Sequence, residues 1–88
     1  MKDDFVHLSK KSLEKVFEWA EKNEHESALA RVYLSACCTV GQMRELDDAS
    51  LGEDGLYEAA WTARCLRDSI GRVILKRIKA EARKAGPQ

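Results

Sequence analysis

The sequence predicts an all-α protein, a small three-helix bundle with a long C-terminal helix. The chain has 88 residues, 44% of them apolar and 34% charged, with one proline and five glycines. This composition is too apolar for a disordered chain and too poor in turn residues for a strand-rich one. Apolar residues recur at helical spacing in three segments, and no segment alternates apolar with polar residues as a strand does. We therefore expect residues 1–88 to form one helical domain.

The first helix is expected to begin after Asp4, which can act as its N-cap, and to end near Asn23. The polar link 24–27 follows. One face of this helix carries the apolar residues that would pack inward, and these are Val6, Leu13, Val16, Phe17 and Ala20.

The second helix has the clearest apolar pattern of the three. Its inward stripe consists of Leu29, Val32, Tyr33, Ala36, Val40 and Met43. Gly41 lies within this pattern and costs about 1 kcal/mol relative to alanine in a helix interior. Two outcomes are open, because the helix can continue through Gly41 or end near Val40 and resume as a short turn.

The third helix follows an acidic connection at 44–55. Within this connection Ser50 and Glu53 have the spacing of a capping box, so we expect the helix to begin there. It can run to about Ala85, where a Gly-Pro pair ends it. At 1.5 Å per residue it would be about 45 Å long. Either its end protrudes from the bundle, or it breaks near 69–71.

Two faces are expected on the third helix. Residues placed at 100° intervals give a packing stripe toward the other helices, made of Leu56, Ala59, Ala60, Ala63, Leu66, Ile70, Ile74 and Ile78. On nearly the opposite side, Tyr57, Trp61 and Cys65 follow one another at four-residue spacing. The two aromatic residues either complete the core of this small protein or form the centre of a contact surface, which self-association could also use.

Charge is balanced in total but unevenly distributed. Fifteen basic and fifteen acidic residues cancel, while residues 72–84 hold six basic groups and one acidic group. The second face of the third helix continues into Arg72, Lys76, Lys79 and Arg83. This basic stripe is either a solvated helix end or a surface for phosphates or an acidic protein. The acidic connection could equally contact a basic partner through Glu45, Asp47, Asp48, Glu53 and Asp54.

The sequence carries no signature of an enzyme, a metal site or a cofactor site. Three cysteines, two of them adjacent at Cys37 and Cys38, fit neither a disulfide framework nor a zinc site, so we expect buried or incidental thiols in a reducing cytoplasm. His25 is poorly placed to activate a cysteine, and His7 could approach one only through tertiary packing. No apolar run is long enough for a membrane span. We expect no catalytic residue, no bound metal and no cofactor.

These observations favour a non-enzymatic protein-interaction module or inhibitor that acts by occupying a partner protein's surface. Short helical chains without motifs are often accessory proteins of phages or plasmids, such as immunity proteins or anti-CRISPR inhibitors, which is an association at the level of class. The alternative is a small nucleic-acid-binding or transcription-regulatory protein that uses the basic C-terminal helix. The expected partner is another protein, including a second copy in a homodimer.

Overall fold

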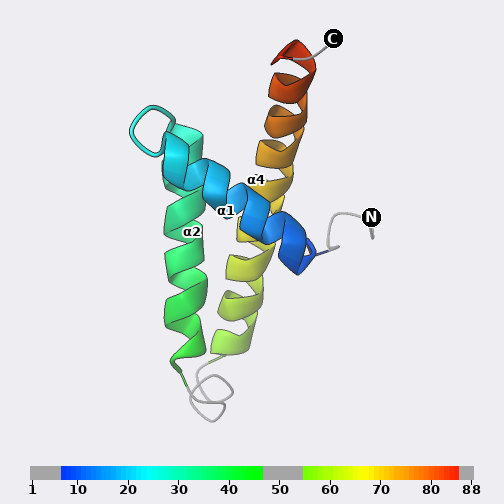
Figure 1. The fold of residues 1–88 in the computed structure, drawn as a ribbon. Coiled ribbons are helices and arrows are strands. Elements are labelled where there is room, and N and C mark those ends of the chain that lie inside the picture. Colours follow the sequence, from blue (N-terminus) through cyan, green and yellow to red (C-terminus); the bar gives the residue numbers. More distant parts are fainter. Residues whose placement is uncertain (1–6, 47–54, 86–88) are drawn as a thin grey trace.

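Residues 7–46 and 55–85 are described in a computed structural model of the protein, and their only regular elements are three helices. Helix α1 spans Lys10–Asn23, α2 spans Ala28–Arg44 and α4 spans Leu56–Ala85 (Figure 1). The predicted all-α fold, with three helices of which the last is the longest, is confirmed. None of these helices has both the length and the apolar character needed to cross a membrane.

Helix α1 ends at Asn23 as predicted, but the predicted start after Asp4 is wrong. Residues 7–9 are not helical, and the helix begins after Ser9. The Ser9 hydroxyl accepts a hydrogen bond from the Ser12 backbone N–H at 3.1 Å, which satisfies one of the unpaired amides of the first turn. The backbone before Ser9 is extended because it is held by contacts to α4 instead.

Helix α2 continues through Gly41 to Arg44 without interruption. It begins after Ser27, whose hydroxyl accepts from the Ala30 backbone N–H at 3.4 Å. A Cβ at Gly41 would meet no atom within 4 Å, so this glycine is not required by a close contact. The helical packing of α2 therefore outweighs the modest penalty of one exposed glycine.

Helix α4 is a single helix of 30 residues, about 45 Å long at 1.5 Å per residue. It does not break near 69–71. It begins at Leu56, directly after Gly55, which has a positive φ of 70° that suits glycine. The predicted start at Ser50 and the predicted capping box of Ser50 and Glu53 lie outside the described residues.

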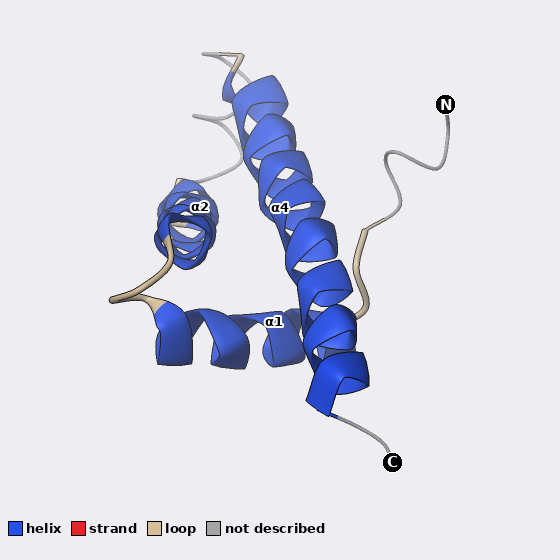
Figure 2. Cartoon of the chain, turned by 90° about the horizontal axis from the view of Figure 1, so that it is seen from above, coloured by secondary structure: helices blue, strands red, loops and turns tan. Residues whose placement is uncertain are grey.

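The three helices form two layers. In Figure 1, α2 and α4 run antiparallel, and α1 crosses in front of both. Figure 2 shows from above that α1 lies on one side of this pair and that α4 is tilted relative to α2. The molecule measures 55 × 31 × 19 Å, and the smallest dimension corresponds to two helix diameters of about 10 Å. One side of the α2–α4 pair is therefore not covered by a described helix.

The core forms where α1 crosses the pair, and its cluster of buried residues is Val16, Ala20, Ala30, Tyr33 and Ile74. The predicted packing stripe of α4 is partly wrong, because the side chain of Leu66 is 54% exposed whereas that of Asp68 is buried. The buried side of α4 therefore faces α1 more directly than the predicted stripe does. Gly71 lies on this side and permits a close approach, since a Cβ there would lie only 2.7 Å from Leu8 Cδ1.

Candidate functional site

Tyr57 and Trp61 lie at the surface, with 55% and 47% of their area exposed. Neither belongs to the core, so the alternative in which they complete the bundle does not hold. Together with Ala60 they form one wall of a groove of about 220 Å³ between the N-terminal half of α4 and the C-terminal half of α2. Val40 and Met43 of α2 form the opposite wall. We call this groove, with Arg44 and Arg64, the aromatic groove.

Arg44 and Arg64 complete the lining of the aromatic groove, one from each helix. Both are exposed, and neither makes an ion pair or hydrogen bond with another described residue. The spacing of Tyr57, Trp61 and Arg64 on α4 places them on one helical face. The groove therefore combines apolar walls with two guanidinium groups that are available to a carboxylate.

Beside the aromatic groove, Asp68 anchors the extended residues before α1. Its Oδ2 accepts hydrogen bonds from His7 Nδ1 at 2.8 Å and from the Leu8 backbone N–H at 3.1 Å. Its Oδ1 accepts from Arg67 Nε at 2.8 Å. Asp68 is 1% exposed, and a charge so deeply buried requires such partners. We call His7, Leu8, Arg67 and Asp68 the Asp68 anchor.

The Asp68 anchor also fixes the indole of the aromatic groove. The imidazole of His7 meets the Trp61 ring edge-on, with ring centroids 5.0 Å apart and an interplanar angle of 83°. Such edge-to-face pairs contribute about 0.5–1.5 kcal/mol beyond the buried area. Because His7 is itself bonded to Asp68, this contact restrains the Trp61 ring in the free protein.

Electrostatics around Asp68 favour the charged carboxylate. Burial alone would raise the pKa of Asp68, but the hydrogen bonds from Arg67, His7 and the Leu8 backbone outweigh burial and lower the pKa below its usual value. An Asp–His pair can orient an imidazole for acid–base catalysis. Here no hydroxyl or thiol of another described residue hydrogen-bonds to His7, whose ring instead contacts Trp61.

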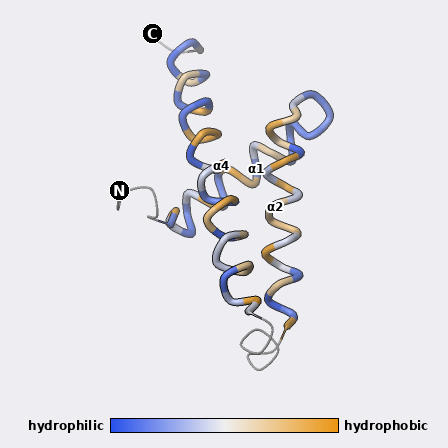
Figure 3. The backbone as a smooth tube through the Cα atoms, turned by 180° about the vertical axis from the view of Figure 1, so that it is seen from behind, coloured by the Kyte–Doolittle hydropathy of each residue, from blue (hydrophilic) through white to orange (hydrophobic). Residues whose placement is uncertain are grey.

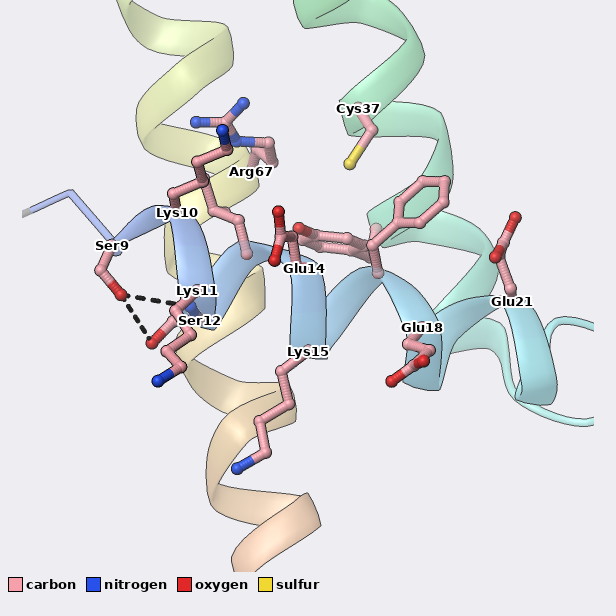
Figure 4. A pocket seen from close by; sticks show the side chains of 13 residues that line it. Ser9, Lys10, Lys11, Ser12, Glu14, Lys15, Glu18, Glu21, Cys37 and Arg67 are labelled. Carbon is pink, nitrogen blue, oxygen red and sulfur yellow. Dashed lines mark hydrogen bonds between the residues drawn. The ribbon is translucent and has the colours of Figure 1, made fainter.

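A second, larger groove of about 790 Å³ lies between α1 and the α2–α4 pair (Figure 4). Its interior includes Tyr33 and Cys37, and burial raises the pKa of both side chains. Three lysines and three glutamates from α1 surround it together with Arg67, and these are Lys10, Lys11, Lys15, Glu14, Glu18 and Glu21. Charges of both signs line this rim, so the groove favours no single sign of ligand charge.

The cysteines are less buried than expected. Cys38 is exposed, Cys37 and Cys65 are half-buried, and all three are free thiols. Burial raises the pKa of the Cys37 thiol, which disfavours the reactive thiolate. Neither histidine hydrogen-bonds to a cysteine in the described chain, so no Cys–His pair forms. The described residues also hold no cluster of three or more potential metal ligands.

The remaining predicted contact residues that the structure describes do not line the aromatic groove. The basic stripe lies on the C-terminal half of α4, where Lys76, Lys79 and Arg83 are exposed. Arg72 is half-buried and donates from Nη2 to Ser69 Oγ at 3.4 Å. Of the acidic group, Glu45 is exposed and caps the end of α2. The other four residues, Asp47, Asp48, Glu53 and Asp54, lie outside the described residues.

Sequence reasoning missed Arg44, Arg64 and Asp68 as members of the site. The two arginines come from different helices, and only the pairing of α2 with α4 brings them to one groove. The sequence does hold one indication that another segment packs near Asp68, because Gly71 lies one turn later inside a long helix. Such a glycine often marks a close approach of another segment. Comparison with protein-family models, curated proteins and solved structures gave no match to this chain.

Proposed function

We propose that the protein is a non-enzymatic binding protein that occupies the surface of a partner protein through the aromatic groove. The observation that carries this proposal is the exposed pair Tyr57 and Trp61, set in a groove of about 220 Å³ beside two arginines that pair with no other described residue. Tryptophan, tyrosine and arginine are the residues that most often dominate interface energetics. The matching partner segment has an apolar side chain for the groove and a neighbouring carboxylate for Arg44 or Arg64.

The aromatic groove is smaller than a complete protein–protein interface. Specific interfaces bury about 800 Å² on each partner. A groove of this size holds one or two side chains, so it would act as the central anchor of a wider contact. The wider contact would include the neighbouring end of α2 and the first turns of α4. An inhibitor of the phage or plasmid accessory type, acting in a reducing cytoplasm, is one form of this function, and the free thiols are compatible with it.

Capture with matched baits tests the proposal. The wild-type protein, Tyr57→Ser, Arg64→Glu and Leu66→Ser would each be used as bait in a lysate of the native host, followed by mass spectrometry. Tyr57 and Leu66 lie on the same helix with nearly equal exposure, 55% and 54%, so removal of either costs similar surface area. We expect at least tenfold weaker recovery of the partner by Tyr57→Ser and Arg64→Glu.

Leu66→Ser controls for the loss of an exposed apolar side chain, and it should retain the partner. Circular dichroism would verify that every bait is helical. If the partner binds Tyr57→Ser and Arg64→Glu as well as it binds the wild-type protein, the aromatic groove is not the docking site. Loss of the partner by Leu66→Ser alone would place the interface on a different side of α4.

Nucleic-acid binding is the second candidate function, and a specific observation favours it. The C-terminal half of α4 protrudes beyond α1 in Figure 1, with Lys76, Lys79 and Arg83 exposed along one side. With Arg72, these cations extend over about 16 Å of helix, which is comparable to several phosphate spacings. A protruding basic helix can enter a groove of a duplex, whereas a basic surface flat against the protein would not.

A further inference from the structure

The larger groove and the aromatic groove are neighbours on the same side of the α2–α4 pair. On α2, Cys37 lines the larger groove and Val40, three residues later, lines the aromatic groove. On α4, Arg67 and Arg64 have the same relation. Residues three positions apart on a helix are neighbours on one face. The two grooves therefore adjoin along both helices.

Together they form one depression that follows the contact between α2 and α4. We call the aromatic groove together with Cys37 and Arg67 the seam groove. Helix α1 crosses the pair at one end of it, and in Figure 1 the rest of the pair, toward the end of α2 and the start of α4, is not covered by α1. From Tyr57 to Arg67 the seam groove extends about 15 Å, which is the length of about three helical turns.

The seam groove is largely apolar inside. Val40 is 4% exposed, and Met43 and Ala60 beside it are half-buried. Figure 3 shows apolar positions recurring along both α2 and α4 over the length that the two helices share. An occupant with apolar side chains along one face would therefore lose little hydration there that it does not regain as contacts.

The walls of the seam groove favour a helical occupant. Both walls are helices, whose backbone groups are hydrogen-bonded internally except in the end turns. An extended segment would find few partners there for its own backbone, whereas a helix satisfies its backbone by itself. Helix α1 packs against the same side of the pair in this way, with Val16 and Ala20 fully buried.

Charge further restricts the occupant. Every charged residue of α2 and α4 that lines either groove is an arginine, and these are Arg44, Arg64 and Arg67. Lys10 adds a cation where α1 begins, and Figure 4 shows its side chain at the same side of the larger groove as that of Arg67. The glutamates that line the larger groove all belong to α1, which closes one end. The α2 and α4 walls therefore favour carboxylates along the length of the occupant.

We infer that the seam groove binds an acidic amphipathic helix of about three turns from the partner protein, an inference that rests on the proposed docking role of the aromatic groove. One face of this helix places apolar side chains at helical spacing against Val40 and Met43. Its flanking carboxylates meet Arg44 on one side and Arg64 and Arg67 on the other. A nucleic-acid strand would bring phosphates to the arginines but no apolar ridge to the walls.

Selection of displayed random peptides on the full chain tests this inference. Peptides that also bind the double variant Tyr57→Ser, Arg64→Glu would be discarded, so that those that remain require the groove. We expect them to be acidic, to carry apolar residues at helical spacing, and to gain helical circular dichroism on binding. Selected peptides that are basic or rich in proline, or that bind without becoming helical, would overturn the inference, as would a selection that yields no peptide dependent on the groove.

Titration of the best selected peptide, followed by fluorescence polarisation, tests whether binding extends beyond the aromatic groove. Lys10→Glu reverses a charge at the α1 end, and we expect about three- to tenfold weaker binding. Lys22→Glu makes the same change on an exposed residue of the same helix that lines neither groove, and it should change binding less than about twofold. Equal weakening by both variants would indicate a general charge effect and contradict the assigned position of the helix.

The outcomes distinguish this inference from the proposed function. If capture of the partner depends on Tyr57 and Arg64 but the partner binds through an extended segment, the docking role stands and the helical occupant is wrong. Capture that is independent of both residues contradicts the proposed function and this inference together. Sedimentation equilibrium adds one more check, because self-association that Tyr57→Ser abolishes would place a second copy in the seam groove and overturn the inference.

Discussion

Asp68 shows how one buried side chain organises the start of the chain. Its carboxylate receives three hydrogen bonds, from His7, Leu8 and Arg67, and thereby holds an extended segment against α4. Because His7 also contacts Trp61, the same carboxylate supports the wall of the aromatic groove. Replacement of Asp68 would therefore also affect the position of Trp61 in the aromatic groove.

Asp68→Asn should destabilise the protein by about 2–3 kcal/mol near pH 6, since an amide nitrogen would face one of three hydrogen-bond donors. The folded-state pKa of Asp68 lies below its usual value. Its contribution to the free energy of unfolding is thus present above the unfolded pKa of about 3.9, and is lost as pH falls through the folded pKa. Urea unfolding at pH 6 and pH 3 would show the wild-type advantage shrinking in acid.

Glu21→Gln is the control for that experiment, because Glu21 is exposed and forms no ion pair within the described residues. It should change the free energy of unfolding by less than about 0.5 kcal/mol at either pH. If Asp68→Asn matches this control at pH 6, the anchor contributes little to stability.

At the residue scale, the sequence predicted that the aromatic and basic residues of α4 lie apart from its packing stripe. It did not predict which side chains of α4 are buried. Tyr57 and Trp61 were correctly placed on a face apart from the main stripe, and the structure exposes them. The burial of Asp68 was not predicted, because a carboxylate is normally solvated. Two of its three partners, Leu8 and His7, lie 60 and 61 positions earlier, and no local pattern carries such a pairing.

At the scale of elements, helix type was predictable and helix boundaries were less so. The apolar period of α2 was long and regular, and of the two outcomes left open at Gly41 the helix shows continuation, over Ala28–Arg44. The predicted start of α1 was wrong because both Asp4 and Ser9 are good N-cap residues, and only tertiary contacts decide between them. The packing stripe of α4 was misplaced at Leu66 because α1 crosses α4 rather than lying alongside it.

Two glycines within helices should respond oppositely to alanine. Gly41→Ala meets no atom within 4 Å and should raise the free energy of unfolding by about 0.5–1 kcal/mol. Gly71→Ala would bring a Cβ to 2.7 Å from Leu8 Cδ1 and 3.4 Å from Tyr33 Cε1. The overpacking should offset the gain and leave this variant about 1–3 kcal/mol less stable than Gly41→Ala.

Thermal and urea unfolding of the two alanine variants, side by side, checks this expectation. Their helix-propensity terms are nearly equal, so the difference reports the contact at Gly71. Equal stabilisation by both substitutions would mean that Leu8 does not pack against α4 in solution, and would contradict the close approach of the extended segment.

At the scale of the whole molecule, the charge is strongly polarised. Residues 72–84 carry a net charge of +5, and residues 1–71 carry −5. If the protruding basic helix binds duplex DNA, affinity should fall steeply with salt, and Lys76→Ala with Lys79→Ala should lower the slope of log affinity against log salt by about two. Titration at several salt concentrations measures both quantities. Absence of binding at low salt would remove this second function.

The Asp68 anchor also has a consequence for the order in which the protein is assembled during synthesis. His7 and Leu8 leave the ribosome before their carboxylate partner, which is made some sixty residues later. The link between Trp19 and Glu81 has a similarly long separation. Such contacts close late because a large stretch of chain must first be confined. The segment before α1 should therefore stay undocked until α4 has emerged.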